Sequence, residues 1–506
     1  MTLSIVYTRA HAGITAPLVT VETHISYGMP GLSIVGLPEK AVKESKDRVR
    51  SALINTEFEF PTRRMTVNLA PADLPKDGGR FDLPIALGIL AASGQIPAES
   101  LAQYEFTGEL ALSGELRPVS GVLPMVLGVK QSARTLIVPQ ANAIEAALVQ
   151  PAAVYSAKHL LEVCAFLRSH VALPACSLMT PLAKKIDPLD LADVKGQAHA
   201  KRALEIAAAG KHSLLFMGPP GTGKTMLAMR LPTLLPPLSD QQALEVATVA
   251  SVSMSGFDPA NWKVIPFRAP HHSASGVAMV GGGRPPGPGE ISLAHHGVLF
   301  LDELPEYNRH VLEMLREPLE SGQVTISRAA FQTIFPAQFQ LIAAMNPCPC
   351  GYAGNPQSPC RCTVEHIERY LAKLSGPLLD RIDMHVEVPG LSQEILVNIE
   401  QKQRVNSQTV RDRVIQARHQ QLSRQQKCNV DLTTRELESY CQLQPESRNL
   451  LSQVMQKLNL SARAYHRILK VARTIADLSG SDVITVQCLS EALTYRCLEK
   501  LKFMRR

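Results

Sequence analysis

One stretch of eight residues constrains the fold of this 506-residue chain more than any other: Gly218, Pro219, Pro220, Gly221, Thr222, Gly223, Lys224 and Thr225. An apolar run, residues 213–217, comes before it, and a run with helical spacing, residues 226–231, comes after it. Strand, glycine-rich turn and helix in this order are typical of a phosphate-binding loop. Backbone amides of such a loop and the helix N-terminus surround phosphates. We therefore expect Lys224 to reach the β and γ phosphates of a nucleotide and the Thr225 hydroxyl to bind Mg²⁺.

Two further runs end in polar side chains that suit the same chemistry. Residues 298–301 are apolar and lead into Asp302 and Glu303, and residues 339–345 lead into Asn346. Parallel strands in such sheets are buried on both faces, and ligands bind at their carboxyl ends. Asp302 is expected to hold Mg²⁺ through water, Glu303 to polarise an attacking water, and Asn346 to orient that water. The adjacent acids favour hydrolysis over nucleotide binding alone.

Bulk composition permits this interpretation and excludes some others. The net charge is +7 and the pI is near 8.8, a mildly basic balance that allows nucleic-acid binding without requiring it. The start of the chain lacks the pattern of a signal peptide, and no apolar run is long enough to span a membrane. We expect a cytoplasmic protein with no membrane partner.

The pattern along the chain predicts an α/β protein of three parts. Residues 1–170 alternate between strand and helix patterns, and residues 171–189 form a proline-containing linker. Residues 190–390 carry the P-loop and a parallel sheet, and residues 391–506 are almost wholly helical in pattern.

Two longer phrases carry a family resemblance. Arg268-Ala269-Pro270-His271-His272 and Gly289-Glu290-Ile291-Ser292-Leu293-Ala294-His295 resemble the magnesium-chelatase branch of AAA+ ATPases. The whole chain resembles the YifB/ComM family. The resemblance implies ATP and Mg²⁺ as ligands and a hexameric ring that acts as a DNA helicase or translocase, promoting branch migration in recombination or natural transformation. Its partners would be single-stranded, forked or branched DNA and recombination proteins. A protein-remodelling ATPase and a chelatase-type ATPase subunit remain alternatives.

The family pattern also implies roles for individual residues. Asn346 becomes sensor 1, Arg381 the arginine finger that reaches a neighbouring subunit's nucleotide, and Arg463 the sensor 2 arginine of a helical lid. An arginine supplied in trans neutralises charge on the γ-phosphate and makes hydrolysis depend on assembly. Alternatively, Arg381 forms an ordinary salt bridge with Asp380 or Asp383. Arg467 and Arg473 lie on the same predicted helix as Arg463 and compete for its role.

The region between Thr225 and Asp302 is longer than a minimal P-loop domain needs. Residues 281–289, rich in glycine, are expected to be a structureless part of this insertion. Residues 323–327 alternate like a hairpin strand and end at Arg328, our candidate for a DNA contact in a central pore; a plain surface arginine is the alternative. For His271, His272, His295 and His296 we expect packing or hydrogen bonding, because adjacent histidines on regular elements point apart.

Four cysteines are clustered within an insertion at residues 347–363: Cys348, Cys350, Cys360 and Cys362. The loop between the two pairs is too rich in glycine and proline to pack a core. Four thiolates that close on Zn²⁺ would hold it, although each pair is spaced more tightly than in standard fingers. Unliganded cysteines or a redox or iron–sulfur role are the alternatives. A rigid knob at this place, with Arg361 on it, could grip DNA.

Residues 65–95 and 108–138 resemble the proteolytic domain of Lon proteases. The position of Lon's nucleophilic serine is Arg80 here, and the position of its dyad lysine is Leu123. Without an oxygen nucleophile and its base a Ser–Lys mechanism cannot run. We expect a Lon-like fold without peptidase activity, in which Lys76 and Arg80 belong to a basic group that contacts either DNA or solvent.

Overall fold

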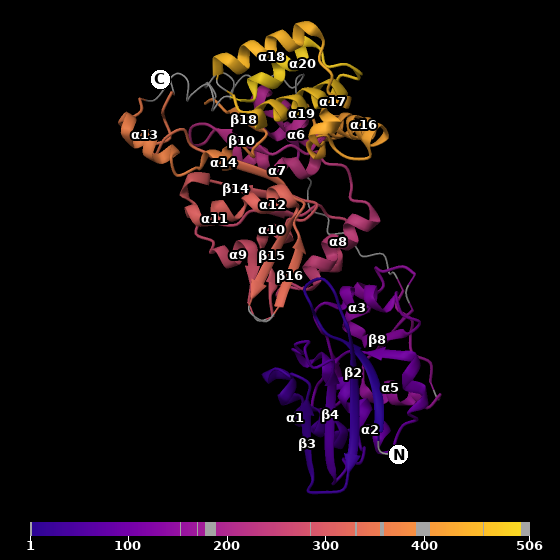
Figure 1. Cartoon of the computed structure of the whole chain (residues 1–506). Coiled ribbons are helices and arrows are strands. Elements are labelled where there is room, and N and C mark those ends of the chain that lie inside the picture. Colours follow the sequence, from indigo (N-terminus) through magenta and orange to yellow (C-terminus); the bar gives the residue numbers. More distant parts are fainter. Residues whose placement is uncertain are drawn as a thin grey trace.

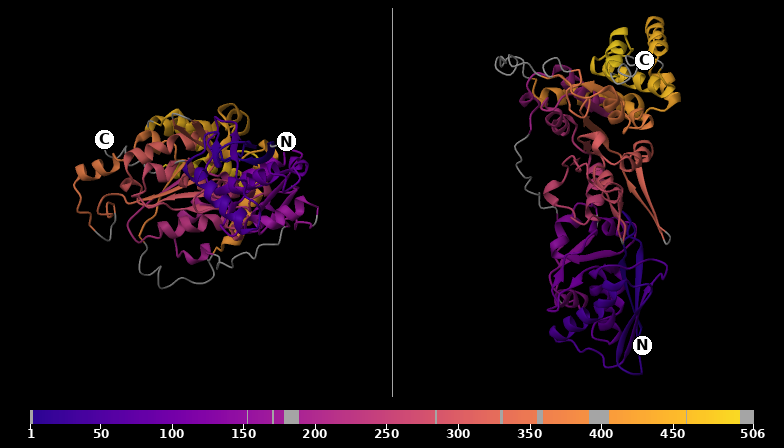
Figure 2. Two further views of the ribbon diagram at one scale, coloured as in Figure 1. Left: turned by 90° about the horizontal axis from the view of Figure 1, so that it is seen from below. Right: turned by 90° about the vertical axis from the view of Figure 1, so that its left-hand side faces the viewer.

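The computed structural model describes residues 3–151, 153–169, 171–177, 189–283, 285–328, 331–354, 359–390, 405–458 and 460–496. The molecule is elongated: an N-terminal α/β part lies at one end, the P-loop sheet lies in the middle, and the C-terminal helices lie at the other end (Figure 1). Figure 2 shows the same succession from the side. None of the helices in the described ranges combines the length and the apolar character that crossing a lipid bilayer requires.

The N-terminal part is built on a seven-stranded mixed sheet in the order β3-β4-β2-β1-β5-β8-β9. Alternate residues of β2 are buried, and α2 is buried all round because it packs on β1 and β2. The sheet's strands are β1 (Leu3–Arg9), β2 (Leu18–Ser26), β3 (Gly31–Val35), β4 (Arg64–Ala70), β5 (Tyr104–Phe106), β8 (Thr135–Pro139) and β9 (Val154–Ala157). The helices are α1 (Lys40–Asn55), α2 (Asp82–Ala92), α3 (Val122–Val129), α4 (Ala143–Ala146) and α5 (Leu160–Leu167), and β6 (Glu109–Leu110) pairs with β7 (Leu116–Arg117).

The P-loop sheet has five parallel strands in the order β11-β14-β17-β10-β18. Strands β10, β14 and β17 are fully buried, as expected for a parallel sheet covered on both faces. The strands are β10 (Leu214–Met217), β11 (Phe267–Arg268), β14 (Val298–Leu301), β17 (Gln340–Met345) and β18 (Met384–Glu387). The accompanying helices are α6 (Ala198–Gly210), α7 (Lys224–Leu234), α8 (Asp240–Ser251), α9 (Gly276–Val280), α10 (Glu290–Leu293), α11 (Arg309–Met314), α12 (Arg316–Ser321), α13 (Val364–Leu371) and α14 (Gly376–Leu379).

Two short ribbons stand apart from this sheet. β15 (Gln323–Arg328) pairs antiparallel with β16 (Phe331–Pro336), which matches the hairpin expected before Asn346. β12 (Gly281–Gly282) pairs with β13 (Gly287–Pro288). The prediction that this glycine-rich segment is structureless was therefore wrong. Its backbone approaches too closely for side chains: a Cβ on Gly281 would lie 2.4 Å from the Gly287 carbonyl oxygen. The glycines therefore permit close pairing rather than disorder.

The C-terminal described residues are helical, as their pattern predicts. The helices are α16 (Ser407–Gln425), α17 (Thr434–Tyr440), α18 (Pro445–Leu458), α19 (Ala462–Leu478) and α20 (Val486–Thr494). Helix α19 ends just before Gly480, whose φ of +68° does not continue a helix. Helices α16 and α19 pack on α6, so the lid shares the core of the P-loop sheet.

The N-terminal part is joined to the P-loop part through α8. The backbone N–H of Gly121 donates to the carbonyl of Ser251 at 2.9 Å, and the Ser251 hydroxyl donates to Glu145. Helix α3 packs against α8, and Ala247 of α8 belongs to the apolar cluster of α3 and β8. A second contact joins the turn after β1 to the hairpin, since a Cβ on Gly13 would lie 2.5 Å from Thr333 Cγ2.

A buried carboxylate, Asp383, ties the lid to the starting edge of the P-loop sheet. It accepts from the backbone N–H and the hydroxyl of Ser213, both at 2.8 Å, and forms an ion pair with Arg467 of α19. Burial alone would raise its pKa, but Arg467, His212 and Ser213 outweigh burial and lower the pKa of Asp383 to about 2.

Replacing Asp383 is expected to weaken the whole P-loop part. The Asp383→Asn variant leaves the guanidinium of Arg467 without its buried partner, so the free energy of unfolding should fall by about 3 kcal/mol, the lower end for a broken buried pair. Because the folded pKa lies below the ordinary value, this stabilisation is present above about pH 4 and is lost as the pH falls towards 2.

Urea unfolding followed by circular dichroism measures both effects. The midpoints of wild type and Asp383→Asn should differ at pH 7 and converge in acid. Asp380→Asn, three residues away on the partly exposed end of α14, is the matched control and should unfold like wild type. Equal midpoints for all three proteins at pH 7 would contradict the role of Asp383.

Candidate nucleotide site and metal centre

The predicted phosphate loop joins β10 to α7 in the expected order. Gly221 and Gly223 have φ +76° and +88°, and a Cβ on either would meet no atom within 4 Å, so the outer side of the loop is open. Lys224 begins α7 and is buried, and its ammonium group donates to the carbonyls of Gly218 and Pro219, both at 2.8 Å. Its third partner is Asn346 Oδ1 at 3.1 Å, so the structure brings the predicted lysine and sensor together.

The two predicted magnesium ligands also meet. The Thr225 hydroxyl donates to Asp302 Oδ2 at 2.7 Å, across the carboxyl ends of β10 and β14. These are the hard oxygen donors that Mg²⁺ takes beside substrate phosphates, so the residues present fit that ion. Glu303 follows directly in the left-handed region, with φ +51°. Such strain in a residue other than glycine is a mark of functional sites, and here it separates the directions of two adjacent acids.

The charges of the site are partly buried and act on one another. Burial lowers the pKa of Lys224, while Asp302 and Glu303 oppose that shift. Burial together with the same two acids raises the pKa of Tyr307, whose hydroxyl donates to the Pro270 carbonyl. The site therefore brings together the cationic Lys224 and the two anions Asp302 and Glu303, an arrangement that bound phosphates and a divalent cation would complete.

Two residues of this region were missed from the sequence. Gln197, in the left-handed conformation before α6, donates through its side-chain amide to the carbonyls of Thr222 at 3.3 Å and Pro389 at 2.8 Å. His272 Nδ1 lies 3.6 Å from Glu303 Oε2. For His272 the sequence predicted only packing or hydrogen bonding, without Glu303 as its neighbour. Nothing in the pattern around Gln197 signalled a contact with the P-loop.

The predicted arginine finger lies at the opposite edge of the sheet. Arg381 comes three residues before β18, and parallel pairing aligns the start of β18 with the start of β10, whereas the P-loop follows the end of β10. Its side chain is buried and pairs with Glu320 at 2.6 Å, and it also donates to the Pro377 carbonyl. The alternative partners, Asp380 and Asp383, are not the ones that it uses.

The predicted sensor 2 residue lies on that same edge. Arg463 is exposed in the first turn of α19, one turn before Arg467, which pairs with Asp383. Arg473 is buried and pairs with Asp477, so it serves the packing of the lid. Within one chain, neither Arg381 nor Arg463 is brought to the P-loop.

The two candidate DNA contacts are placed differently. Arg328 is the last residue of β15, and its side chain lies outside the described part of the structure, as do residues 329 and 330 at the tip. Arg361 is exposed between Cys360 and Cys362.

The four clustered cysteines converge. The Sγ atom of Cys348 lies 3.3 Å from that of Cys350 and 3.7 Å from that of Cys360, and all four sulfur atoms lie within 4.8 Å of one another. Four thiolates around one Zn²⁺ with bonds of about 2.3 Å have sulfur atoms about 3.8 Å apart, so the set fits a tetrahedral zinc site. The backbone N–H groups of Tyr352 and Arg361 lower the pKa of Cys350, whereas desolvation and the neighbouring cysteines raise the pKa of Cys360 and Cys362, so the geometry and not these shifts carries the metal assignment.

The histidine pairs behave differently from the expectation that their rings point apart. The ring centroids of His295 and His296 are 3.9 Å apart because His296 has φ +53° and the pair lies in a turn, and both rings bond Glu245 of α8. His295 Nδ1 accepts from the backbone N–H of Gln338, so its other nitrogen carries the proton. That proton points at Glu245, so the three side chains form a hydrogen-bonded joint between α8 and the turn before β14. The expected hydrogen-bonding role is thus met by this pair.

The Lon-like positions hold no dyad and are buried. Arg80 is buried, and burial lowers its pKa to about 10; Lys76 is fully buried. The expectation that these two belong to a basic group facing DNA or solvent was wrong, because the turn that carries them folds inward. Leu123 is buried in the joint with α8.

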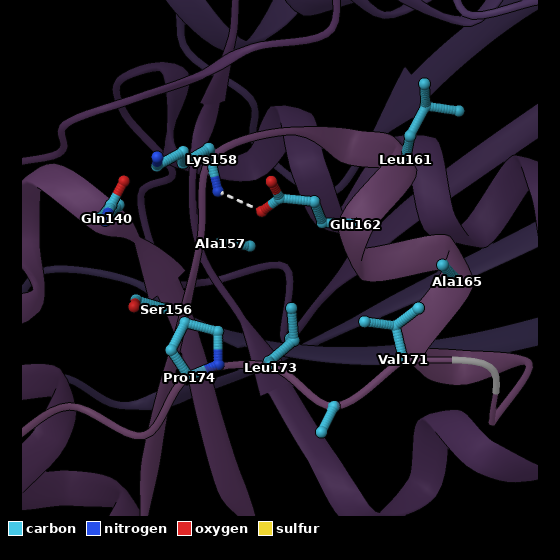
Figure 3. Close-up of a pocket in the computed structure, with 11 residues that line it drawn as sticks. Gln140, Ser156, Ala157, Lys158, Leu161, Glu162, Ala165, Val171, Leu173 and Pro174 are labelled. Carbon is cyan, nitrogen blue, oxygen red and sulfur yellow. Dashed lines mark hydrogen bonds between the residues drawn. The ribbon is translucent and has the colours of Figure 1, made fainter.

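A cavity of about 530 Å³ in the N-terminal part is a separate feature (Figure 3). It lies between β9, α5 and residues 171–174, and apolar side chains such as Leu161, Val171 and Leu173 form much of its wall. Glu162 turns back to accept from the backbone N–H of Lys158. The cavity lacks the convergent polar groups of the nucleotide site.

Comparison with known proteins agrees with this architecture. Family models match three stretches: "Magnesium chelatase, subunit ChlI" at residues 190–396, "Subunit ChlI of Mg-chelatase" at residues 21–142, and "Magnesium chelatase, subunit ChlI C-terminal" at residues 404–496. The competence protein ComM of Haemophilus influenzae is 54% identical over 99% of both chains. The uncharacterized protein YifB of Escherichia coli is 51% identical over 99% of this chain and 98% of its own.

A more distant match concerns another class of protein. Lon protease 2 of Bacillus subtilis is 30% identical over 43% of this chain and 44% of its own length. The full-length matches and the magnesium-chelatase models together imply an AAA+ fold with ATP and Mg²⁺ as ligands. By its sequence across its whole length, this chain belongs to the YifB/ComM family of magnesium-chelatase-like AAA+ proteins.

Proposed function

We propose that this protein is an ATP-dependent DNA motor, a helicase or translocase that works as a hexameric ring and promotes branch migration in recombination or natural transformation. The observation that carries the proposal is the meeting of Lys224, Thr225, Asp302 and Asn346 at one edge of the sheet. The chain that holds this site is closely similar over its whole length to a competence protein.

Each residue of the site has a task in hydrolysis. Lys224 and the amides of the P-loop hold the β and γ phosphates, and Thr225 and Asp302 hold Mg²⁺, which neutralises phosphate charge when bound. Glu303 draws a proton from the attacking water, and His272 at 3.6 Å orients its carboxylate. Asn346, bonded to Lys224, stands where it can direct that water.

Arg381 and Arg463 act on the nucleotide of the next subunit. Both lie on the edge of the sheet where the strands begin, so a ring that places this edge against a neighbour's P-loop supplies both arginines in trans. Arg381 must then exchange Glu320 for the γ-phosphate. This placement supports the proposed ring and the proposed dependence of hydrolysis on assembly.

DNA contacts are assigned to the hairpin of β15 and β16, in which β15 ends at Arg328, and to the cysteine loop that carries the exposed Arg361. Zn²⁺ held by the four cysteines stiffens that loop. Protein remodelling is the second candidate, because a hairpin in a pore also grips polypeptide. A chelatase-type subunit is the third, and the cysteine cluster and the Lon-like part argue against it.

The ATPase rate with different polymers tests the proposal. We expect hydrolysis to rise with single-stranded, forked or four-way DNA and to be indifferent to unfolded protein. Lys224→Ala should lose nucleotide binding, and Glu303→Gln should bind nucleotide while kcat falls by about 10²-fold or more. Stimulation by unfolded protein alone would replace the DNA motor with a remodelling ATPase.

Arg381→Ala should abolish assembly-dependent hydrolysis and leave nucleotide affinity unchanged. The expected loss in kcat is about 10³-fold, as for other arginines that act on a transferring phosphoryl group. Arg435→Ala, an exposed arginine of α17, is the control and should hydrolyse ATP like wild type. Mixing Arg381→Ala with Lys224→Ala should restore part of the rate at mixed interfaces, and a failure to do so with intact assembly would argue against action in trans.

Elemental analysis tests the metal. Purified wild type is expected to hold one tightly bound zinc ion per chain, and a Cys348→Ser/Cys360→Ser double variant to hold none, because two thiolates cannot complete the tetrahedron. Cys428→Ser in the lid should retain the zinc. Equal zinc in the double variant and wild type would remove the metal from the proposal.

A further inference from the structure

The cysteine loop, which is the insertion at residues 347–363 that carries the four clustered cysteines, contacts the P-loop through Gly351. Gly351 is buried, with φ +86°, and a Cβ on it would lie 2.7 Å from Pro220 Cδ and 3.9 Å from Asn346 Cγ. Its backbone therefore packs against the phosphate loop at Pro220, away from the open space beside Gly221 and Gly223. A tiny cavity of about 50 Å³ between the two loops, lined in part by Pro219, Pro347 and Ala353, shows how closely they approach.

The same loop begins at the end of β17, where Asn346 lies. The backbone N–H of Gly218, the first residue of the P-loop, donates to the Met345 carbonyl at 3.2 Å. Asn346 Oδ1 accepts from Lys224, and Cys348 follows two residues later, fully buried. The first cysteine thus anchors the chain just beyond the residue that is to direct the attacking water.

The turn at Gly351 is held by groups on the cysteines. The backbone N–H of Gly351 donates to the Cys348 carbonyl at 3.0 Å, and the backbone N–H of Ala353 donates to Cys348 Sγ at 3.3 Å. Apart from the cysteines, the described part of this loop offers few apolar side chains, so the convergence of thiolates must offset the entropy of ordering it.

We propose that the metal-bound cysteine loop is a positioning element of the ATP site. The loop holds Pro220 in place through the contact at Gly351, and it holds Asn346 in place because it begins directly after that residue. Metal occupancy then sets nucleotide affinity and hydrolysis, independently of any contact between Arg361 and DNA. The proposal rests on the proposed ATPase function and on a metal at the four cysteines. It gives that metal a role in nucleotide binding, which is distinct from a role in holding a DNA-contacting loop rigid.

Two glycines of one loop provide a matched test. Gly351 and Gly354 both have left-handed backbones, with φ +86° and +77°, but a Cβ on Gly354 would meet no atom of the described residues within 4 Å. Alanine therefore strains both backbones alike, and only at Gly351 does it push on Pro220. In the full-length chain, Gly351→Ala should weaken binding of a fluorescent ATP analogue about tenfold and lower kcat by up to about 10²-fold, since small displacements at a reacting centre carry such costs.

Gly354→Ala should stay within about twofold of wild type in both quantities, and both variants should keep their zinc. As a measurement without substitution, zinc is removed from wild type with a chelator and then restored. Nucleotide affinity, measured without DNA, should fall and recover with the metal, while circular dichroism shows the fold intact.

The outcomes separate the two proposals. A wild type that binds no ATP analogue would refute the ATPase function. A wild type that binds it with equal affinity with and without zinc would refute the positioning role alone, and so would equal losses in Gly351→Ala and Gly354→Ala. If zinc removal lowers the affinity for DNA and leaves the affinity for nucleotide unchanged, the loop serves DNA binding and this inference is wrong.

Discussion

The buried carboxylate of Asp383 is the interaction on which the rest of the P-loop part depends. It fixes the start of the strand that ends in the P-loop, through Ser213, and it holds the lid, through Arg467. Arg381 lies two residues away and is therefore set in place by the same carboxylate. One desolvated charge, stable only while it is fully bonded, aligns the nucleotide-binding edge, the opposite edge and the lid.

Much of the nucleotide site could be predicted from the sequence because its signals are local. The P-loop glycines, Asp302 and Asn346 each follow an apolar run, and the edge at which parallel strands end brings them together. The cysteine cluster was also visible in the sequence, although each pair is spaced more tightly than in standard fingers and the structure was needed to show that the four sulfur atoms converge.

The parts that escaped prediction depend on long-range packing or on single backbone angles. Nothing near Lys76 and Arg80 in the sequence shows that their turn folds inward. The left-handed backbone of His296 turns two rings onto one glutamate, although adjacent side chains on a regular element would diverge. Glu320, the partner of Arg381, is far away in sequence, so neither acid beside the arginine was the right choice.

The joint between α3 and α8 restricts which side chains the N-terminal part can carry. Leu123, which the sequence resemblance aligns with the catalytic lysine of Lon, packs in an apolar cluster with Ala247 of the P-loop part, and Gly121 is bonded to Ser251. A lysine restored at position 123 would place an ammonium group in that cluster, which costs several kcal/mol unless the group is paired. A serine restored at position 80 would leave the space of a buried arginine empty. A lysine at position 123 would therefore weaken the joint between the two parts of the molecule, so the attachment of the N-terminal part restricts the side chains that this position can carry.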